Sequence, residues 1–287
     1  MSDRKLFDNL FLSIGAMKAG TTWLFAVLSR HPELHFTLEK EIHYFYHRYV
    51  NHNQLSELHR LENARNRYLM RFEPDKADAQ KVRDNLRWVG AYLDTPVDDI
   101  WYRNLFELRG RETYACDFSN LTAHIPADAW PRVQAIVRRL RVLYTMRDPV
   151  KRLWSHTKFH LQVTNQLEKL KTWSPGDFEA FVRQPHIWNN AEYGAVLRRL
   201  REGLAPETYK VIFYEDIHAD QIAMLRDIEK FLGVAEFNYP EPLLNRRFTE
   251  SAKIEMPAFF PGLFAADIAR IRSEIEAEGH TLPAAWG

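Results

Sequence analysis

The first residues with clear chemical potential lie in segment 10–23, which reads LFLSIGAMKAGTTW. Residues 10–14 are a nearly continuous apolar run, which is the pattern of a strand buried on both faces. Gly15 and Gly20 allow a tight turn and a close approach of the backbone to a ligand. A loop of free N–H groups at a helix start binds anions, and Lys18 adds a full positive charge. The segment therefore predicts a strand, an anion-binding loop and a helix.

This loop differs from a P-loop, in which the lysine follows the second glycine of GxxxxGK[ST]. Gly15 and Gly20 have that spacing, but Thr21 comes next and the lysine lies inside the loop. The displaced lysine argues against a P-loop-like nucleotide kinase or NTPase, which stays an alternative function. Taken alone, the loop also fits an ordinary strand–turn–helix with a solvated lysine. Thr21 or Thr22 is expected to cap the helix, whose apolar face begins with Trp23.

Glu41 and His43 follow a short apolar alternation at 34–38, which predicts a second strand. If the chain stays extended, the two side chains lie on the same side, because side chains alternate with period two. A carboxylate beside an imidazole, close to an anion-binding loop, is a candidate pair for proton transfer. From the local sequence alone, a surface cluster of charges with Glu39 and Lys40 is the stronger interpretation.

A second chemically informative segment is 146–156, MRDPVKRLWSH. Its proline favours the first turn of a helix, which places Arg147 at the end of the preceding strand. Arg152 and Ser155 are three residues apart and share a helix face. An arginine fork with a hydroxyl suits a phosphate dianion. An ion pair between Arg147 and Asp148, with Arg152 in solvent, is an equal alternative.

Strands that alternate with helices must position these groups. The further strands expected are 113–118, 141–146 and 209–214, and helical stretches between them include 130–140 and 191–201. This alternation predicts a single α/β domain over residues 1–287, with a central, mainly parallel sheet flanked by helices. Ligands of such sheets bind beyond the carboxyl ends of the strands, where each expected strand ends in polar residues.

Two further parts of the chain are expected to be helical. Residues 47–108 combine many charges with apolar residues at helical spacing, which predicts an insertion on the substrate side of the core. Insertions of this kind often determine specificity for the variable substrate. The tail from 259 to 286 is expected to be an amphipathic helix with a proline-containing end, packed through Ile268, Ile271 and Ile275.

The composition excludes several classes of protein. The chain has 287 residues and a formal net charge of +1, which argues against a protein that coats nucleic acid. A single cysteine, Cys116, excludes an intramolecular disulfide framework and a multi-cysteine metal site. No apolar run approaches the ~18 residues of a membrane span, and the polar start is unlike a signal peptide. We therefore expect a cytoplasmic protein without a metal, while the oligomeric state is left open.

Together, segments 15–23 (GAMKAGTTW) and 147–155 (RDPVKRLWS) resemble two motifs of the sulfotransferase superfamily, whose donor is 3′-phosphoadenosine 5′-phosphosulfate (PAPS). Segment 15–23 is similar to the 5′-phosphosulfate loop of that family, and segment 147–155 is similar to its 3′-phosphate motif, RDPxxRxxS. Segment 40–45 (KEIHYF) is similar to the KExHFF-type segment of glycan sulfotransferases related to the heparan sulfate enzymes. Segments 213–217 and 231–234 resemble the YEDL…FLG element of the family.

The resemblance implies a P-loop-like fold and in-line transfer of a sulfuryl group from PAPS to an acceptor hydroxyl on a carbohydrate or small metabolite, with PAP as product. Lys18 would contact the phosphosulfate and stabilise charge on the leaving phosphate. A metal is less needed than in phosphoryl transfer, because the sulfate monoanion carries less charge. The residues implied to bind the donor are Ala19, Gly20, Thr21, Thr22 and Trp23 in the loop, Arg147 and Ser155 at the 3′-phosphate, and Arg246 and Arg247 as a candidate clamp.

The resemblance also proposes groups on the acceptor side. Glu41 matches the general base of the glycan enzymes, whereas the small-molecule enzymes use a histidine, so His43 stays open as the base. Asp117 and Ser119 lie at the polar end of an expected strand, where the family often has an acidic residue and a serine near the active site. A non-catalytic nucleotide-binding or glycan-binding module on the same fold is the remaining alternative.

Overall fold

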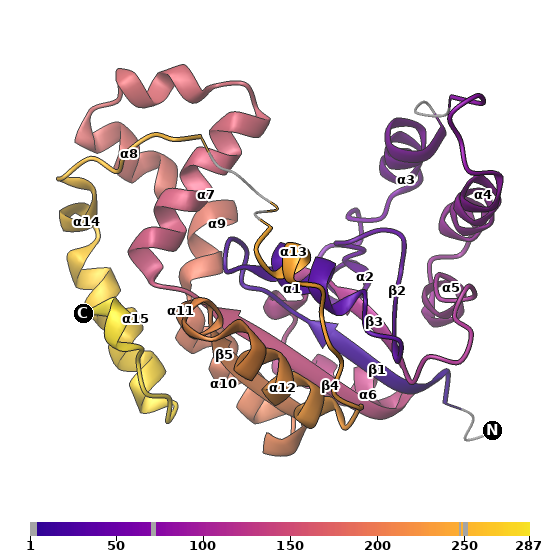
Figure 1. Ribbon diagram of the computed structural model, residues 1–287. Coiled ribbons are helices and arrows are strands. Elements are labelled where there is room, and N and C mark those ends of the chain that lie inside the picture. Colours follow the sequence, from indigo (N-terminus) through magenta and orange to yellow (C-terminus); the bar gives the residue numbers. More distant parts are fainter. Residues whose placement is uncertain (1–4, 70–72, 247, 249–251) are drawn as a thin grey trace.

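Five parallel strands form the centre of the computed structural model, which describes residues 5–69, 73–246, 248 and 252–287. The strands are β1 (Phe7–Ser13), β2 (Leu34–Phe36), β3 (Tyr114–Phe118), β4 (Val137–Met146) and β5 (Tyr209–Phe213). Their order in the sheet is β2-β3-β1-β4-β5, and every neighbouring pair is parallel. Helices cover both faces of this sheet (Figure 1), which confirms the predicted α/β fold class.

The central place of β1 brings distant segments together at one edge of the sheet. Leu12 of β1 pairs with Asp117 of β3 on one side and with Val142 of β4 on the other. Because the strands are parallel, their carboxyl ends meet at the same edge. The chain leaves β1 toward β2 and β3, and β4 lies on the opposite side of β1. The loops after β1 and β4 therefore flank the crevice where open α/β sheets bind ligands.

The apolar run of β1 packs into both helical layers, as expected for a strand buried on both faces. Leu10 and Leu12 belong to the larger buried cluster, whereas Phe11 belongs to the second. The helices that contribute to the first cluster include α5 (Asp99–Asn104), α6 (Trp130–Ala135), α10 (Tyr193–Gly203) and α15 (Ala265–Ala277); those of the second include α1 (Thr21–Leu28), α12 (Gln221–Leu232) and α13 (Glu241–Leu244).

The first turn of α1 differs from the expected capping. Gly20 is the N-cap residue, with a φ of 85°, and no side chain caps the helix. Thr21 and Thr22 lie inside the first turn, so the expectation that one of them is the cap is wrong. A Cβ atom on Gly20 would lie 2.8 Å from Cδ2 of Tyr214. Both the backbone angle and the available space therefore require glycine at this position.

Two groups of helices stand apart in Figure 1, one around α3 and α4 and the other around α7 and α8. Within the segment 47–108, where an insertion is predicted, the chain is helical apart from its connections: after α2 (Tyr44–Tyr49) come α3 (Glu57–Ala64), the π-helix η1 (Arg65–Leu69), α4 (Ala79–Leu93) and α5. The opposite group consists of α7 (Pro149–Val163), η4 (Leu167–Lys171), α8 (Pro175–Val182), α9 (Pro185–Trp188) and α14 (Phe260–Leu263).

Short helical turns make many of the connections. These are η2 (Asn120–His124), η3 (Ala127–Ala129), η5 (Asn189–Ala191), η6 (Pro206–Thr208), α11 (Tyr214–Ala219) and η7 (Ala284–Trp286). In the part of the chain that the structure describes, no helix combines the length and the apolar character that crossing a bilayer requires.

The predicted boundaries fail at one helix and at the tail. The helix expected over 130–140 ends at Ala135, and β4 begins at Val137, because this end of the strand pairs with the start of β1. Arg138 and Arg139 are exposed there, so the sequence lacks the apolar run of a buried strand. The tail forms two helices, α14 and α15, rather than one. The three isoleucines of α15 are buried as predicted.

Candidate active site

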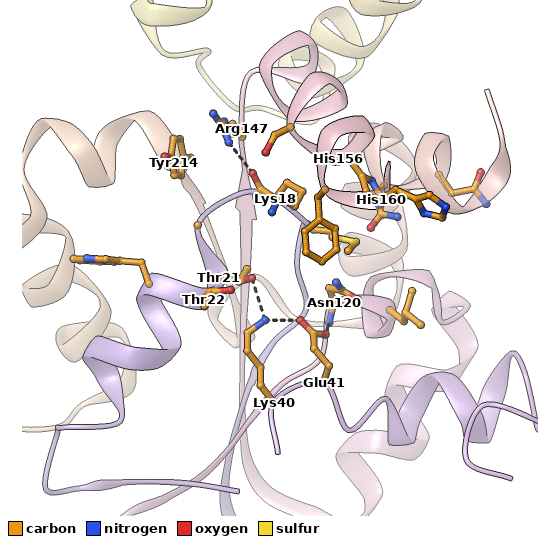
Figure 2. Close-up of a pocket in the computed structure, with 18 of the residues that line it drawn as sticks. Lys18, Thr21, Thr22, Lys40, Glu41, Asn120, Arg147, His156, His160 and Tyr214 are labelled. Atoms are coloured by element: carbon orange, nitrogen blue, oxygen red, sulfur yellow. Dashed lines mark hydrogen bonds and ion pairs between the residues drawn. The ribbon is translucent and has the colours of Figure 1, made fainter. Parts of the chain in front are cut away.

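A cavity of about 1520 Å³ opens at the carboxyl ends of β1, β3 and β4 (Figure 2). Its wall combines the loop after β1, the segment after β2, the end of β4 and one side of α7. The sequence-predicted site residues that line it are Lys18, Gly20, Thr21, Thr22, Trp23, Glu41, His43, Arg147, Ser155 and Arg246. Ala19, Asp117 and Ser119 do not line it, and Arg247 lies outside the described residues.

The loop after β1 presents free backbone donors to this cavity. Within the described residues, the N–H groups of Gly20, Thr21 and Thr22 have neither a backbone nor a side-chain acceptor. Ala19 is fully buried and its N–H donates to the carbonyl of Ala16 at 3.1 Å, so it is not one of the free donors. Three free N–H groups at a helix N-terminus form an anion-binding site.

Lys18 adds its charge to the same site. Its backbone is left-handed, with a φ of 68°, and its ammonium lies 4.2 Å from the ring centre of Phe159 on α7. Burial and, to a smaller extent, the nearby positive charges of Arg147, Lys40 and Lys158 together lower the pKa of Lys18 to about 8. The cavity therefore holds an excess of positive charge that an anion would neutralise.

Arg147 lies where β4 meets the loop after β1. Its Nη1 donates to the carbonyl of Lys18 at 3.1 Å, and its guanidinium lies 4.4 Å from the ring centre of Tyr214. Among the described residues no carboxylate lies within ion-pair distance of this guanidinium, so the alternative of an Arg147–Asp148 ion pair is wrong. Asp148 instead caps α7 and lies 3.3 Å from Arg272. The charge of Arg147 is thus available to a ligand.

Arg152 does not share this wall, contrary to the expected pairing with Ser155. Its side chain is fully buried on the inner side of α7, where Nη2 donates to the carbonyl of Ile187 at 3.1 Å. Its Nη1 lies 3.1 Å from Nδ1 of His156. Ser155 lines the cavity while Arg152 faces the interior, so neither the shared phosphate site nor the solvated arginine is correct. Arg152 instead packs α7 against α9.

Glu41 and His43 lie together across the cavity from Lys18 (Figure 2 labels Glu41). The segment is not extended, because Glu41 and His43 have φ values of 67° and 60°; the left-handed turn brings Oε2 of Glu41 to 3.7 Å from Nε2 of His43. Oε1 of Glu41 pairs with the ammonium of Lys40, and Oε2 accepts from the N–H of Asn120 at 2.8 Å. The ammonium of Lys40 also lies 3.5 Å from Oγ1 of Thr21, which links the carboxylate to the loop after β1.

These charges are not a solvated surface cluster. Glu39 is buried and paired with Arg67, and the side chains of Glu41 and His43 are 26% and 14% exposed. Burial lowers the pKa of His43, although the charge of Glu41 acts in the opposite direction. The imidazole is therefore neutral at pH 7. A neutral imidazole and a carboxylate can both accept a proton.

Asp117 and Ser119 lie beneath this turn. Oγ of Ser119 donates to Asp117 at 2.6 Å and accepts from the N–H of His43 at 2.9 Å. The hydroxyl of Tyr102 donates to the other oxygen of Asp117 at 2.9 Å. Burial raises the pKa of Asp117 to about 6, against the two hydrogen bonds that lower it. Both residues are almost fully buried, so they support the turn instead of lining the cavity.

The segment after α13 closes another side of the cavity. Arg246 and Phe248 both line it, with the guanidinium 5.1 Å from the ring centre. This agrees with a clamp of a cation beside an aromatic ring. Arg247, which belongs to the same predicted clamp, lies outside the described residues.

Sequence reasoning missed a part of the wall that α7, α9, α10 and η2 build. The residues concerned are His124, His156, His160, His186 and Arg199. Each lies in a helix or beside one, and periodicity gives no signal that separates cavity residues from surface residues. Although several histidines gather here, no group of three or more potential ligands among the described residues could hold a metal ion.

Comparison with known proteins agrees with this geometry. The sulfotransferase family matches residues 11–238. A sulfotransferase from Alicyclobacillus acidocaldarius has a similar structure, with 21% identity and a TM-score of 0.62 over 96% of this chain and 97% of that one. The sulfotransferase domain of the Synechococcus PCC 7002 olefin synthase is 18% identical, with a TM-score of 0.51 over 98% of each chain.

The sulfotransferase domain from the curacin biosynthetic pathway is 15% identical, with a TM-score of 0.53 over 96% of this chain and 99% of that one. Among curated sequences no relative matches. At these identities the solved structures show a common fold. The family match spans most of the chain, and this protein therefore belongs to the sulfotransferase family.

Proposed function

We propose that this protein transfers a sulfuryl group from PAPS to an acceptor hydroxyl. One observation carries the proposal: the loop after β1 and the end of β4 meet in one cavity, where Nη1 of Arg147 donates to the carbonyl of Lys18 at 3.1 Å. Two anion sites that are far apart in the sequence thus become neighbours. A nucleotide with phosphates at both its 5′ and its 3′ positions requires such a pair of sites.

The residues of this chain fit the donor. The free N–H groups of Gly20, Thr21 and Thr22 would bind the 5′-phosphosulfate together with Lys18. Arg147, which has no carboxylate partner among the described residues, would bind the 3′-phosphate with Ser155. Trp23 and the Arg246–Phe248 pair would flank the adenine, because flat rings and guanidinium groups stack on bases.

The transition state of this reaction accumulates charge on the equatorial oxygens and on the leaving oxygen, as in phosphoryl transfer. Lys18 and the loop N–H groups are fixed before the reaction, so they need no reorganisation when that charge develops. A preorganised donor of this kind lowers the activation barrier by roughly 3 kcal/mol. In this step the acceptor oxygen forms a bond to sulfur, the bond from sulfur to the bridging phosphate oxygen breaks, and the hydroxyl proton leaves.

Glu41 is the base that we propose for that proton. Its carboxylate is the more exposed of the two candidates, and it lies across the cavity from Lys18. Lys40 pairs with it and also lies 3.5 Å from Oγ1 of Thr21, so the charge of the bound donor would compete with the carboxylate for Lys40. His43, neutral and 3.7 Å away, positions the carboxylate and can share the proton.

The acceptor that we propose is a sugar hydroxyl or the hydroxyl of a small metabolite. The support is the KEIHYF segment at 40–45 and the size of the cavity, which exceeds the ~300–1000 Å³ of common ligand sites. A cavity of this size has room for the donor nucleotide together with a second molecule.

Calorimetric titration with PAP tests the donor site without knowledge of the acceptor. We expect PAP to bind the wild-type protein in the presence of EDTA, with at least tenfold weaker binding in Arg147→Ala, because a charged hydrogen bond contributes roughly 1.5–3 kcal/mol. Lys5→Ala is the matched control, since Lys5 lies on the distant amino-terminal side of β1 and donates to the carbonyl of Ala135. Binding of magnesium-ATP in preference to PAP would refute the proposal.

A further inference from the structure

The cavity extends beyond the groups that donor binding and proton removal use. This acceptor-side wall is formed by the end of η2, by α9 and η5, and by the first turns of α10. Its residues are His124, His186, Asn189, Asn190, Ala195 and Arg199. Most of these are neutral, and Arg199 is the group among them with a permanent charge.

Arg199 differs from the other arginines of α10 in its partners. Arg198 lies 3.4 Å from Glu274, and Arg201 lies 2.8 Å from Glu278. In the described part of the chain, by contrast, no carboxylate lies within 4 Å of the Arg199 guanidinium. Three arginines within one turn of the same helix thus have different environments, and the one that lines the cavity lacks a counter-ion.

The guanidinium of Arg199 is also short of hydrogen-bond acceptors. Its Nη2 donates to the carbonyl of Ala123 at 3.1 Å, and its buried Nε has no partner among the described residues. Arg147, the proposed 3′-phosphate ligand, and Arg152 share two properties with it: a buried Nε without a partner and no ion pair among the described residues. Of these two, Arg147 lines the cavity as Arg199 does, whereas Arg152 does not. A partly buried cation of this kind is unfavourable unless a ligand supplies the missing negative charge.

Nearby charged groups do not supply this missing negative charge. Glu192, which also lines the cavity, lies 2.8 Å from Arg270 and accepts from the indole N–H of Trp188 at 2.7 Å. His124 is neutral, because burial, together with the nearby charges of Arg199 and Arg152, lowers its pKa to about 4. Within the described part of the chain, Arg199 therefore has no counter-ion on this wall.

Arg199 and the proposed base bond the same turn of the chain. The N–H of Asn120 donates to Glu41, and the carbonyl of Ala123 accepts from Arg199. Asn120 and Ala123 belong to the same turn, η2, in which each residue advances about 2 Å. Glu41 and Arg199 therefore bond the two ends of one short turn, and both line the cavity.

We infer that Arg199 binds an anionic group of the acceptor, so that the acceptor is a hydroxyl compound that also carries a carboxylate. The planar fork of arginine suits the two oxygens of a carboxylate. This inference rests on the proposed function, because it assigns Glu41 and the cavity around it to the acceptor. It makes Arg199 a specificity-determining residue.

Paired acceptors test this inference. The panel contains 4-nitrophenyl β-glucuronide and ω-hydroxy fatty acids of graded length, each beside its uncharged primary amide, with PAPS as donor. For the wild-type protein we expect kcat/KM to be about tenfold to a hundredfold higher for an acid than for its amide. Arg199→Gln should remove this preference by lowering kcat/KM for the acids toward that for their amides. Arg199→Lys, which keeps the charge but not the fork, should retain part of it.

Arg198→Gln is the matched control, because this neighbour has its own carboxylate and should keep the full preference. PAP affinity and the midpoint of thermal unfolding, measured for each variant, separate this inference from the proposed function. A wild-type protein that does not bind PAP would refute the proposed function itself. A protein that binds PAP but sulfates no acid of the panel, or prefers the amides, or keeps its acid preference in Arg199→Gln, would overturn the role of Arg199.

Discussion

The protonation of Lys18 should make donor binding depend on pH. Burial and three neighbouring cations lower the pKa of Lys18 to about 8, well below its ordinary value. A bound nucleotide places phosphate charge beside the ammonium and so favours its protonated form. The pKa of Lys18 should therefore be higher in the complex than in the free protein, and binding should take up protons from solution at pH 8–9.

The size of the effect follows from linkage between proton binding and nucleotide binding. If the complex restores the ordinary pKa of Lys18, the affinity for PAP is nearly constant below pH 7 and falls as the pH rises through 8. It should be about tenfold weaker at pH 9 than at pH 7, and binding should take up about half a proton at pH 8. The phosphates of PAP do not contribute, because their second ionisation, with a pKa near 6, is complete above pH 7.

Calorimetry in buffers of different ionisation enthalpy measures both the affinity and the proton uptake. Lys18→Arg is the matched control, since a guanidinium stays charged over this range, so its affinity should not depend on pH. Lys18→Ala should bind more weakly than the wild type at pH 7, and the difference should narrow toward pH 9. If wild-type affinity were the same at pH 7 and 9, or if Lys18→Arg showed the same decline, Lys18 would not be the titrating group.

Three substitutions test other parts of the site. Glu41→Gln should keep PAP affinity within about twofold and lower kcat by about 10² to 10⁴-fold; a larger loss in His43→Gln would move the role of base to the imidazole. Gly20→Ala should weaken PAP binding, because its Cβ would meet a tyrosine ring, whereas Gly262→Ala, with no atom within 4 Å, should bind normally; equal affinities would contradict the loop geometry. The raised pKa of Asp117 predicts that the wild-type protein loses stability as the pH rises from about 4 to 6, and Asp117→Asn should remove this loss. The same substitution should lower kcat with little effect on PAP affinity. Chemical denaturation measures the stability, and initial rates measure kcat.

The fold was predictable because each strand of the core is an apolar run followed by polar residues. The parallel sheet follows from strands that alternate with helices, and that order leads to the correct edge for the site. The start of β4 was not predictable, since Arg138 and Arg139 are exposed and interrupt the apolar pattern. Their place in a strand depends on pairing with β1, which is a contact distant in sequence.

The donor side of the site was predictable for a local reason, whereas the acceptor side was not. The loop around Lys18 and the segment at Arg147 are short motifs whose chemistry depends on adjacent residues. Arg152 has the right spacing for the same role, but its direction depends on how α7 packs against α9. Arg199 becomes informative only through the absence of a partner in the described structure, and a sequence does not show which arginines of a helix have partners.

The backbone at the candidate catalytic residues explains why the sheet edge matters to the chemistry. Four non-glycine residues in the described structure have positive φ, and three of them are Lys18, Glu41 and His43. A left-handed residue costs about 1–2 kcal/mol, so neighbouring groups must hold each one in place. The guanidinium of Arg147 bonds the carbonyl of Lys18, the last residue of β3 accepts the N–H of Glu41 at 3.0 Å, and Ser119 accepts the N–H of His43. All three holding groups lie at or next to the carboxyl ends of β3 and β4, so the rigid sheet fixes the reacting side chains. Substitutions beneath the cavity should therefore lower kcat more than they weaken donor binding.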